Sequence, residues 1–96
     1  ENKRIGIVAT VKIKEGSGSE FEAVASQLVE KVNANEDGVV YYELFKQDET
    51  TYVFLEKYKD QEAQDAHGKT DYFRELGEQM GPFMAGAPEI KVLQSV

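Results

Sequence analysis

The chain has 96 residues, and its 18 acidic against 11 basic side chains give a formal net charge of −7. This acidic balance argues against nucleic acid and anionic membranes as partners, because both are bound through basic patches. The sequence contains no cysteine, which excludes disulfides, thiolate nucleophiles and cysteine metal sites. The length is that of one small domain, so we expect a single domain over residues 1–96.

No apolar run in the sequence approaches the roughly 20 residues that a membrane-spanning helix needs. A charged and then apolar leader segment is also absent. We therefore expect a cytoplasmic protein without a membrane partner. Because the sequence begins at Glu1 and not at Met, a processed N-terminus, and with it secretion, stays open as the alternative.

The first predicted element is a strand over residues 5–14, where apolar side chains occupy every second position. The glycine- and serine-rich residues 15–20 follow as a turn. A glycine-rich loop between a strand and a helix can cradle a phosphate, but the Walker and dinucleotide patterns are both absent. Plain entry into a helix is therefore the favoured interpretation of this loop.

A first helix is predicted to follow the loop and to end near Asn35. Ser19, followed three positions later by Glu22, forms a capping-box pattern that predicts the helix start at this serine. From Phe21 to Val32 the apolar residues recur at helical spacing, with polar residues between them. The pattern predicts an amphipathic helix with one buried apolar face and one solvent-exposed polar face.

An antiparallel hairpin is predicted next, with strands over residues 39–47 and 51–59 and polar turn residues between them. Side chains alternate between the two faces of a strand, so the hairpin residues divide into two classes. The mostly aliphatic class contains Tyr42, Leu44, Val53 and Leu55. The other class is aromatic and acidic: Tyr41, Glu43, Phe45, Tyr52, Phe54, Glu56 and Tyr58.

This division would bring two carboxyl groups together. In a register that pairs Gln47 with Tyr52, Glu43 lies opposite Glu56, and opposed like charges destabilise unless a proton or hydrogen bonds relieve them. Such a pair can serve proton transfer. The alternatives are relief by solvent or by Arg74, and a register that differs by one residue.

Two short helices are predicted after the hairpin. Asp60 is expected to cap the first, over residues 61–67, and Gly68 to end it in the left-handed conformation. Thr70 is expected to cap the second helix, which runs to about Gln79. Apolar spacing predicts that the second helix buries Phe73, Leu76 and Met80.

A last strand over residues 89–95 completes the order β-α-β-β-α-α-β. This order fits an α+β fold of the ferredoxin-like kind, an antiparallel sheet with helices on one face. The predicted strands are apolar on both faces, and a single layer of helices covers only one of them. We therefore expect a homodimer whose sheets pack face to face.

His67 is the only histidine and is predicted to lie at the end of the first short helix. An imidazole titrates near neutral pH, so next to tyrosines it can act as a base toward a phenolic or quinol hydroxyl. The alternative is a histidine that satisfies the last carbonyls of its helix and contacts no ligand. One histidine with scattered acidic residues does not indicate a zinc or iron site, so we expect no metal.

Missing motifs disfavour two other functions. The sequence has no Gly-x-Ser-x-Gly elbow, and therefore shows no nucleophile for acyl-transfer hydrolysis. An RNA-reading sheet of the same topology would carry a basic, aromatic ribonucleoprotein motif, which is also absent.

Two stretches of the sequence resemble a known family. The first is Glu36-x-Gly38-x-x-x-Tyr42-Glu43-Leu44. The second is Phe54-x-Glu56-x-Tyr58-x-Asp60-x-x-Ala63-x-x-x-His67-x-x-Thr70-x-Tyr72-Phe73. Both stretches look like those of the antibiotic biosynthesis monooxygenase family of dimeric α+β barrels. Together with the element order, the resemblance covers nearly the whole chain.

This resemblance implies a cleft between the sheet and the helices. Family members of the quinol-oxygenase type use O2 without flavin or metal, because the deprotonated substrate ring itself supplies the electron. The protein then supplies a base and an aromatic pocket, and no cofactor is implied. His67 is the implied base, and the residues implied for the pocket or its support are Tyr42, Glu43, Phe54, Glu56, Tyr72 and Phe73.

The family also has a haem-degrading branch with an Asn, Trp and His triad. Aligned by eye, these three fall at Ala9, His67 and Gly77, so the triad is absent and haem degradation is disfavoured. We therefore expect a homodimeric, cofactor-independent monooxygenase that acts on a small aromatic or quinol-type molecule. The alternative is a non-catalytic homodimer of the same fold that binds a small ligand or has a structural role.

Overall fold

The computed structural model describes residues 3–96. Its elements, in chain order, are β1 (Ile5–Lys12), α1 (Gly18–Asn35), β2 (Val39–Asp48), β3 (Thr51–Tyr58), α2 (Gln61–Gly68), α3 (Asp71–Met80), the 3-10 turn η1 (Gly81–Phe83) and β4 (Glu89–Gln94). The four strands form one antiparallel sheet in the order β2-β3-β1-β4. This arrangement confirms the predicted ferredoxin-like α+β fold and its order β-α-β-β-α-α-β.

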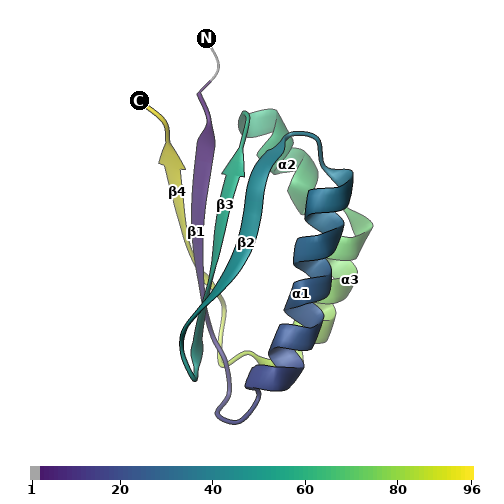
Figure 1. The fold of residues 1–96 in the computed structure, drawn as a ribbon, viewed down its shortest axis with the longest axis vertical. Coiled ribbons are helices and arrows are strands. Elements are labelled where there is room, and N and C mark those ends of the chain that lie inside the picture. The colour runs from purple at the N-terminus through teal and green to yellow at the C-terminus, as the bar shows by residue number, and fades with distance from the viewer. Residues whose placement is uncertain (1–2) are drawn as a thin grey trace.

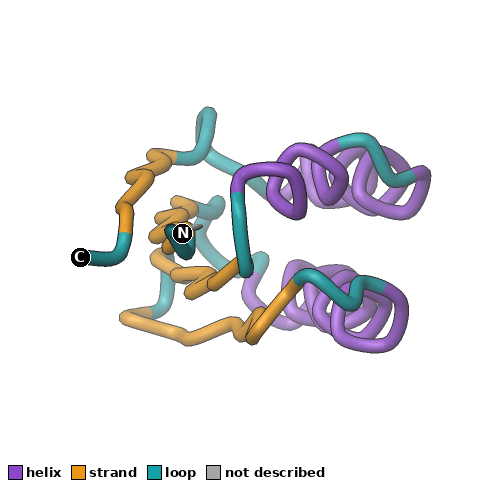
Figure 2. Tube along the Cα trace, turned by 90° about the horizontal axis from the view of Figure 1, so that it is seen from above, coloured by secondary structure: helices purple, strands orange, loops and turns teal. Residues whose placement is uncertain are grey.

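The described chain forms two layers. The helices lie on one side of the sheet, where α1 and α3 pack side by side (Figure 1). The view from above separates the layer of strands from the layer of helices, with β4 at one edge of the sheet (Figure 2). None of the helices within residues 3–96 is long and apolar enough to cross a membrane.

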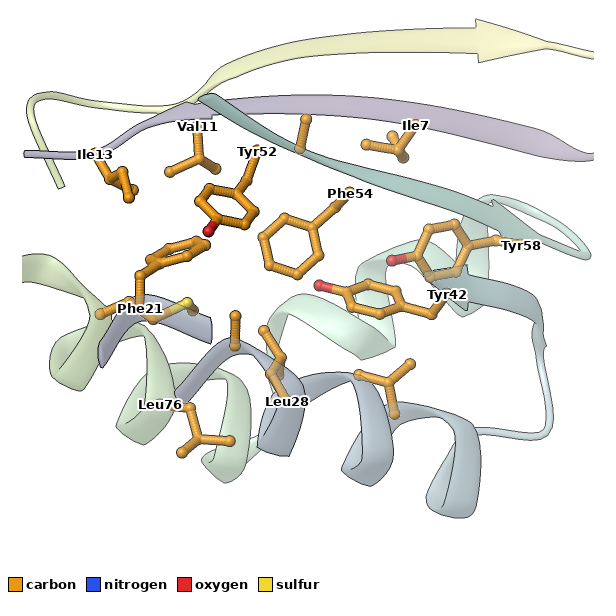
Figure 3. Close-up of a cluster of buried hydrophobic side chains, with 14 of the residues drawn as sticks. Ile7, Val11, Ile13, Phe21, Leu28, Tyr42, Tyr52, Phe54, Tyr58 and Leu76 are labelled. Atoms are coloured by element: carbon orange, nitrogen blue, oxygen red, sulfur yellow. The ribbon is translucent and has the colours of Figure 1, made fainter. Parts of the chain in front are cut away.

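The core lies between the layers because β1 and α1 each present an apolar face to the other. Along the first strand and its extension, every second residue from Ile5 to Ile13 is buried, as the alternation predicts. The buried stripe of α1 consists of Phe21, Ala25, Leu28 and Val32. Figure 3 shows the Phe21 ring next to that of Tyr52, and their centroids lie 4.9 Å apart.

The predicted start of α1 at Ser19 is wrong. The helix begins at Gly18, Ser17 occupies the N-cap position, and the Phe21 N–H donates to the Ser17 carbonyl at 2.9 Å. The Glu22 carboxylate accepts a hydrogen bond from the Tyr52 hydroxyl of β3. This tertiary contact uses the side chain that the capping box would have needed.

The two short helices have the predicted caps. The Asp60 side chain accepts a hydrogen bond from the Ala63 N–H at 2.9 Å, which fixes the start of α2. The Thr70 hydroxyl accepts one from the Phe73 N–H at 3.3 Å at the start of α3. Phe73 itself is 36% exposed, so the prediction that α3 buries it is wrong. The predicted burial of the other two apolar residues of α3 is confirmed: Leu76 and Met80.

The predicted left-handed stop at Gly68 is also wrong. Gly68 is the last residue of α2, and within residues 3–96 only Gly16 has a positive φ, of 81°. The chain leaves α2 through right-handed backbone at Lys69, and the His67 carbonyl accepts hydrogen bonds from the Thr70 N–H at 3.2 Å and from the Thr70 hydroxyl at 2.9 Å. The end of α2 is therefore satisfied without a left-handed glycine.

Two irregularities set the register of β2 against β3. One lies between Val39 and Tyr41 and the other between Lys46 and Asp48, so that Lys46 takes the place opposite Tyr52. The Asp48 carboxylate accepts the Thr50 N–H at 3.0 Å and tightens the turn. A bulge of this kind removes one residue from the ladder and shifts every pair beyond it.

The shifted register separates the two carboxyl groups. Glu43 lies opposite Leu55, and Glu56 lies opposite Tyr42, so the predicted Glu43–Glu56 pair is wrong and the alternative register is correct. The shift also turns Tyr42 toward the helices, where only 3% of it is exposed. It turns Glu43 to the opposite face of the sheet, where the side chain is exposed.

The face of the sheet away from the helices keeps large apolar side chains in contact with solvent. Tyr41 and Phe45 of β2 are 46% and 44% exposed, and Leu93 of β4 is 54% exposed. The predicted second apolar face is thus present. The homodimer that would cover it stays a prediction.

Candidate functional site

A cleft of about 390 Å³ lies between the sheet and the helices α2 and α3, and we call it the inner cleft. Most of its lining is apolar, and all of the strands β1 to β4 and helices α1 to α3 contribute to it. The ionisable side chains in the lining are Tyr42, Glu56, Tyr58 and His67. An apolar cleft with a few polar groups is the usual form of a small-molecule site.

The short helix α2 carries His67 into this cleft. The Asp60 cap sets where α2 begins, and His67 is the one buried residue of α2, with 5% of it exposed. Three aromatic rings surround the imidazole. Their centroids lie 4.8 Å away for Phe73, 5.1 Å for Tyr42 and 5.6 Å for Tyr58.

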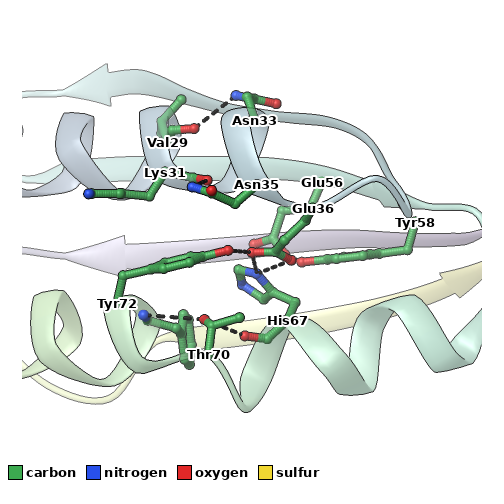
Figure 4. Close-up of polar contacts among 11 residues, drawn as sticks. Val29, Lys31, Asn33, Asn35, Glu36, Glu56, Tyr58, His67, Thr70 and Tyr72 are labelled. Atoms are coloured by element: carbon green, nitrogen blue, oxygen red, sulfur yellow. Dashed lines mark hydrogen bonds and ion pairs between the residues drawn. The ribbon is translucent and has the colours of Figure 1, made fainter.

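One nitrogen of the imidazole binds a carboxylate from a distant part of the chain. His67 Nδ1 lies 3.1 and 3.2 Å from the two carboxylate oxygens of Glu36, the residue that caps the C-terminus of α1. The Tyr72 hydroxyl of α3 donates a hydrogen bond to the same carboxylate (Figure 4). The ring therefore does not satisfy the last carbonyls of its own helix, which was the alternative interpretation of His67.

The other polar atoms of the site face the inner cleft. No hydrogen bond within residues 3–96 engages His67 Nε2, Glu56 Oε2 or the Tyr42 hydroxyl, although all three side chains are buried. Every fully buried side-chain nitrogen or oxygen in this range has a hydrogen-bond partner. Since these three atoms have none, each of them must keep some surface that solvent can reach. Because all three residues line the inner cleft, that is where a ligand can meet them.

Glu56 carries its carboxyl group in an apolar setting. Burial raises its pKa from 4.5 to about 7, the Glu36 charge adds to the rise, and the 2.6 Å hydrogen bond from the Tyr58 hydroxyl opposes it. At neutral pH the carboxyl group therefore exchanges readily between its protonated and ionised forms.

The phenols of the site stay neutral. Burial, together with the nearby carboxylates, raises the pKa of Tyr42 and of Tyr58 far above the usual range. Burial and the hydrogen bond to Glu36 raise the pKa of Tyr72 to about 12. These hydroxyls can donate hydrogen bonds at neutral pH but are poor bases there.

The structure brings together five of the seven site residues that the resemblance implied. These five line the inner cleft: Tyr42, Phe54, Glu56, His67 and Phe73. Tyr72 lies behind the imidazole, bonded to Glu36. Glu43 lies on the opposite face of the sheet and does not line the cleft.

Glu36 is the site residue that sequence reasoning left without a role. It is 31 positions from His67, and the only signal was its place at the start of the first family-like stretch. Residues 3–96 contain no group of three or more His, Asp or Glu arranged to hold a metal ion. That the protein needs no metal or other cofactor stays a prediction.

Comparison with known proteins gives a consistent set of matches. A family model described as antibiotic biosynthesis monooxygenase matches residues 4–79. "Putative monooxygenase YcnE" of Bacillus subtilis is 38% identical over 72 residues, which are 73% of this chain and 75% of YcnE. A crystal structure from Caulobacter crescentus, described as a putative antibiotic biosynthesis monooxygenase, is 45% identical, with a TM-score of 0.93 over 99% of this chain and 92% of its own. A conserved protein from Methanosarcina mazei, at 24% identity, shares the fold with a TM-score of 0.88 over 95% of this chain and 91% of its own.

Proposed function

Because this chain belongs to the antibiotic biosynthesis monooxygenase family, we propose that it is a monooxygenase acting on a small aromatic or quinol-type molecule without flavin or metal. One observation carries the proposal: His67 presents a free Nε2 to an apolar cleft while Glu36 engages its Nδ1. An imidazole held in this way is suited to act as a general base toward a substrate hydroxyl.

In the proposed reaction, His67 Nε2 takes the proton of a phenolic hydroxyl as the O–H bond breaks. The resulting electron-rich ring reacts with O2 directly. One oxygen atom bonds to a ring carbon in place of its hydrogen, and the other oxygen leaves as water. The substrate supplies the electrons for both steps, so that a phenol becomes a quinone and no external reductant is consumed.

The remaining cleft residues have roles in this proposal that follow from their positions. Tyr42, Phe54 and Phe73 provide aromatic surface for the substrate ring. The Glu56 carboxyl, while it carries a proton, can donate a hydrogen bond from Oε2 to the ionised substrate oxygen. Tyr72 supports the site through Glu36, and Glu43 has no part in it.

The test is oxygen uptake by the wild-type protein across a panel of phenols, hydroquinones and naphthols. At least one substrate is expected to give uptake above background, and His67→Ala is expected to lower its rate about 100- to 10,000-fold. Glu49→Gln is the matched control, since its side chain is 89% exposed at the hairpin turn. Absence of wild-type uptake on every member of the panel would contradict the proposal.

The inner cleft also suits a second candidate function, non-catalytic binding of a small apolar ligand. Its mostly apolar lining favours such a ligand whether or not a reaction follows. Isothermal titration calorimetry with the same panel separates the two functions. Binding without oxygen uptake would support the second candidate.

A homodimer and a cytoplasmic location complete the proposal. The exposed Tyr41, Phe45 and Leu93 support a dimer in which the open sheet faces pack together. Light scattering is expected to give twice the chain mass for the wild type and a lower mass for Phe45→Lys. A monomeric wild type at micromolar concentration would contradict the dimer.

A further inference from the structure

His67 separates two clefts. Behind the imidazole lies a second, more polar cleft of about 530 Å³, which we call the outer cleft. It is bounded by the turn between α1 and β2, the start of α2, and Thr70 and Tyr72. His67 lines only the inner cleft and Glu36 lines only the outer one, so their hydrogen bond joins the two.

The contact between His67 and Glu36 is largely buried and involves both carboxylate oxygens. The side chains of His67 and Glu36 are only 7% and 12% exposed, and both carboxylate oxygens lie within hydrogen-bond distance of Nδ1. Tyr72 holds the carboxylate from its other side. A carboxylate fixed in this way accepts a hydrogen bond and so selects the ring form in which Nδ1 carries the proton.

The other ionisable groups around His67 do not compete for this nitrogen. Tyr42 of β2 and Tyr58 of β3 contact the ring through their own rings. Glu56 of β3 accepts from Tyr58 and has no hydrogen bond to the imidazole. Among residues 3–96, Glu36 is therefore the one carboxyl group that is hydrogen-bonded to the imidazole.

We propose that Glu36 is the positioning residue of this site, and that it keeps the proton of His67 on Nδ1 so that Nε2 enters the inner cleft as a free base. The inference rests on the proposed function for its role in turnover. When Nε2 takes the substrate proton, Glu36 lies against the imidazolium that forms and stabilises its charge. The proton stays on the ring until it joins the oxygen that leaves as water.

The position of the imidazole proton tests this proposal without any substrate. Nitrogen NMR of the single histidine is expected to show the proton on Nδ1 in the neutral wild-type ring. Glu36→Ala is expected to lose this preference, because alanine offers no acceptor to Nδ1. Glu36→Gln is expected to weaken it, because the neutral amide oxygen is a weaker acceptor than a carboxylate. Glu62→Ala, which changes an exposed residue of the outer cleft, is the control and is expected to keep it. Circular dichroism checks that each variant is folded.

A proton on Nε2 in the wild type, or an unchanged preference in both Glu36 variants, would overturn the proposal. This result does not depend on activity, so it separates failure of the Glu36 inference from failure of the proposed monooxygenase function.

Turnover gives a second readout. Glu36→Ala is expected to lower kcat about 10- to 100-fold with little change in KM. Formate is expected to restore part of this loss, because the outer cleft gives a small carboxylate access to the vacated position. Formate should not restore His67→Ala. A kcat of Glu36→Ala within twofold of the wild type, on a substrate that the wild type oxidises, would overturn the role in turnover.

Discussion

The contact between Gly38 and Ala63 gives a prediction whose size follows from the structure. A Cβ placed on Gly38 would lie 2.5 Å from the Ala63 Cβ, where ordinary contacts are 3.4 to 4 Å. The β2 end of the sheet and α2 would therefore have to move apart by about 1 Å. Gly38 has no positive φ, so the cost of Gly38→Ala is steric. Overpacking of this kind is expected to lower the free energy of unfolding by about 1 to 3 kcal/mol.

The compensating change is Ala63→Gly, which removes the methyl group that the new Cβ would strike. On its own, this change weakens α2 by up to about 1 kcal/mol through helix propensity. The double variant is expected to be more stable than the sum of the two single changes predicts, with a coupling energy of about 1 to 3 kcal/mol.

Urea-induced unfolding of the four proteins measures this coupling. The wild type, both single variants and the double variant complete one thermodynamic cycle. Strictly additive changes, or a Gly38→Ala protein as stable as the wild type, would refute the steric reasoning. Because α2 carries His67, the methyl group added by Gly38→Ala is also expected to disturb the hydrogen bond between His67 and Glu36.

Three further predictions concern stability. The pKa of Glu56 is raised in the fold, so the stability that its neutral form contributes is present below pH 4.5 and lost as the pH rises through about 7. The unfolding free energy of the wild type, relative to Glu56→Gln, is therefore expected to fall over this range by up to about 3 kcal/mol, as urea titrations at several pH values would show. Thr70→Ala removes the α3 cap and is expected to cost about 1 kcal/mol in urea unfolding, whereas Thr70→Ser keeps the hydroxyl and should cost less. Phe21→Ala is expected to cost about 3 to 5 kcal/mol by the same assay, because the ring is fully buried against Tyr52.

The fold was predictable from local patterns. Alternation over residues 5–14 and helical spacing from Phe21 to Val32 each specify an element and the face that it buries. Asp60 and Thr70 act through neighbours three positions away, so their caps are also visible in the sequence. Such signals need no knowledge of distant parts of the chain.

The errors in the helix start and in the hairpin register arose from features that these local patterns do not contain. Ser19 and Glu22 form a valid capping pattern, yet Glu22 bonds to Tyr52, which is 30 positions away. The register of the hairpin depends on a bulge near Gln47 that alternation alone does not reveal.

The residues of the candidate site were predictable in part. The family-like stretches indicated His67 and the aromatic lining of the cleft. They did not indicate the Glu36–His67 bond, because it forms only when α1, α2 and α3 pack together. The face on which Glu43 lies depended on the same hairpin register.

The most direct test of the central claim is labelling with heavy-oxygen O2 during turnover of a phenol or quinol by the wild type. Mass spectrometry is expected to find one heavy oxygen atom in the quinone product and the second in water. His67→Ala is expected to bind the same substrate and to form labelled product about 100- to 10,000-fold more slowly. Product without heavy oxygen, or equal rates of labelled-product formation by His67→Ala and the wild type, would contradict the proposed function.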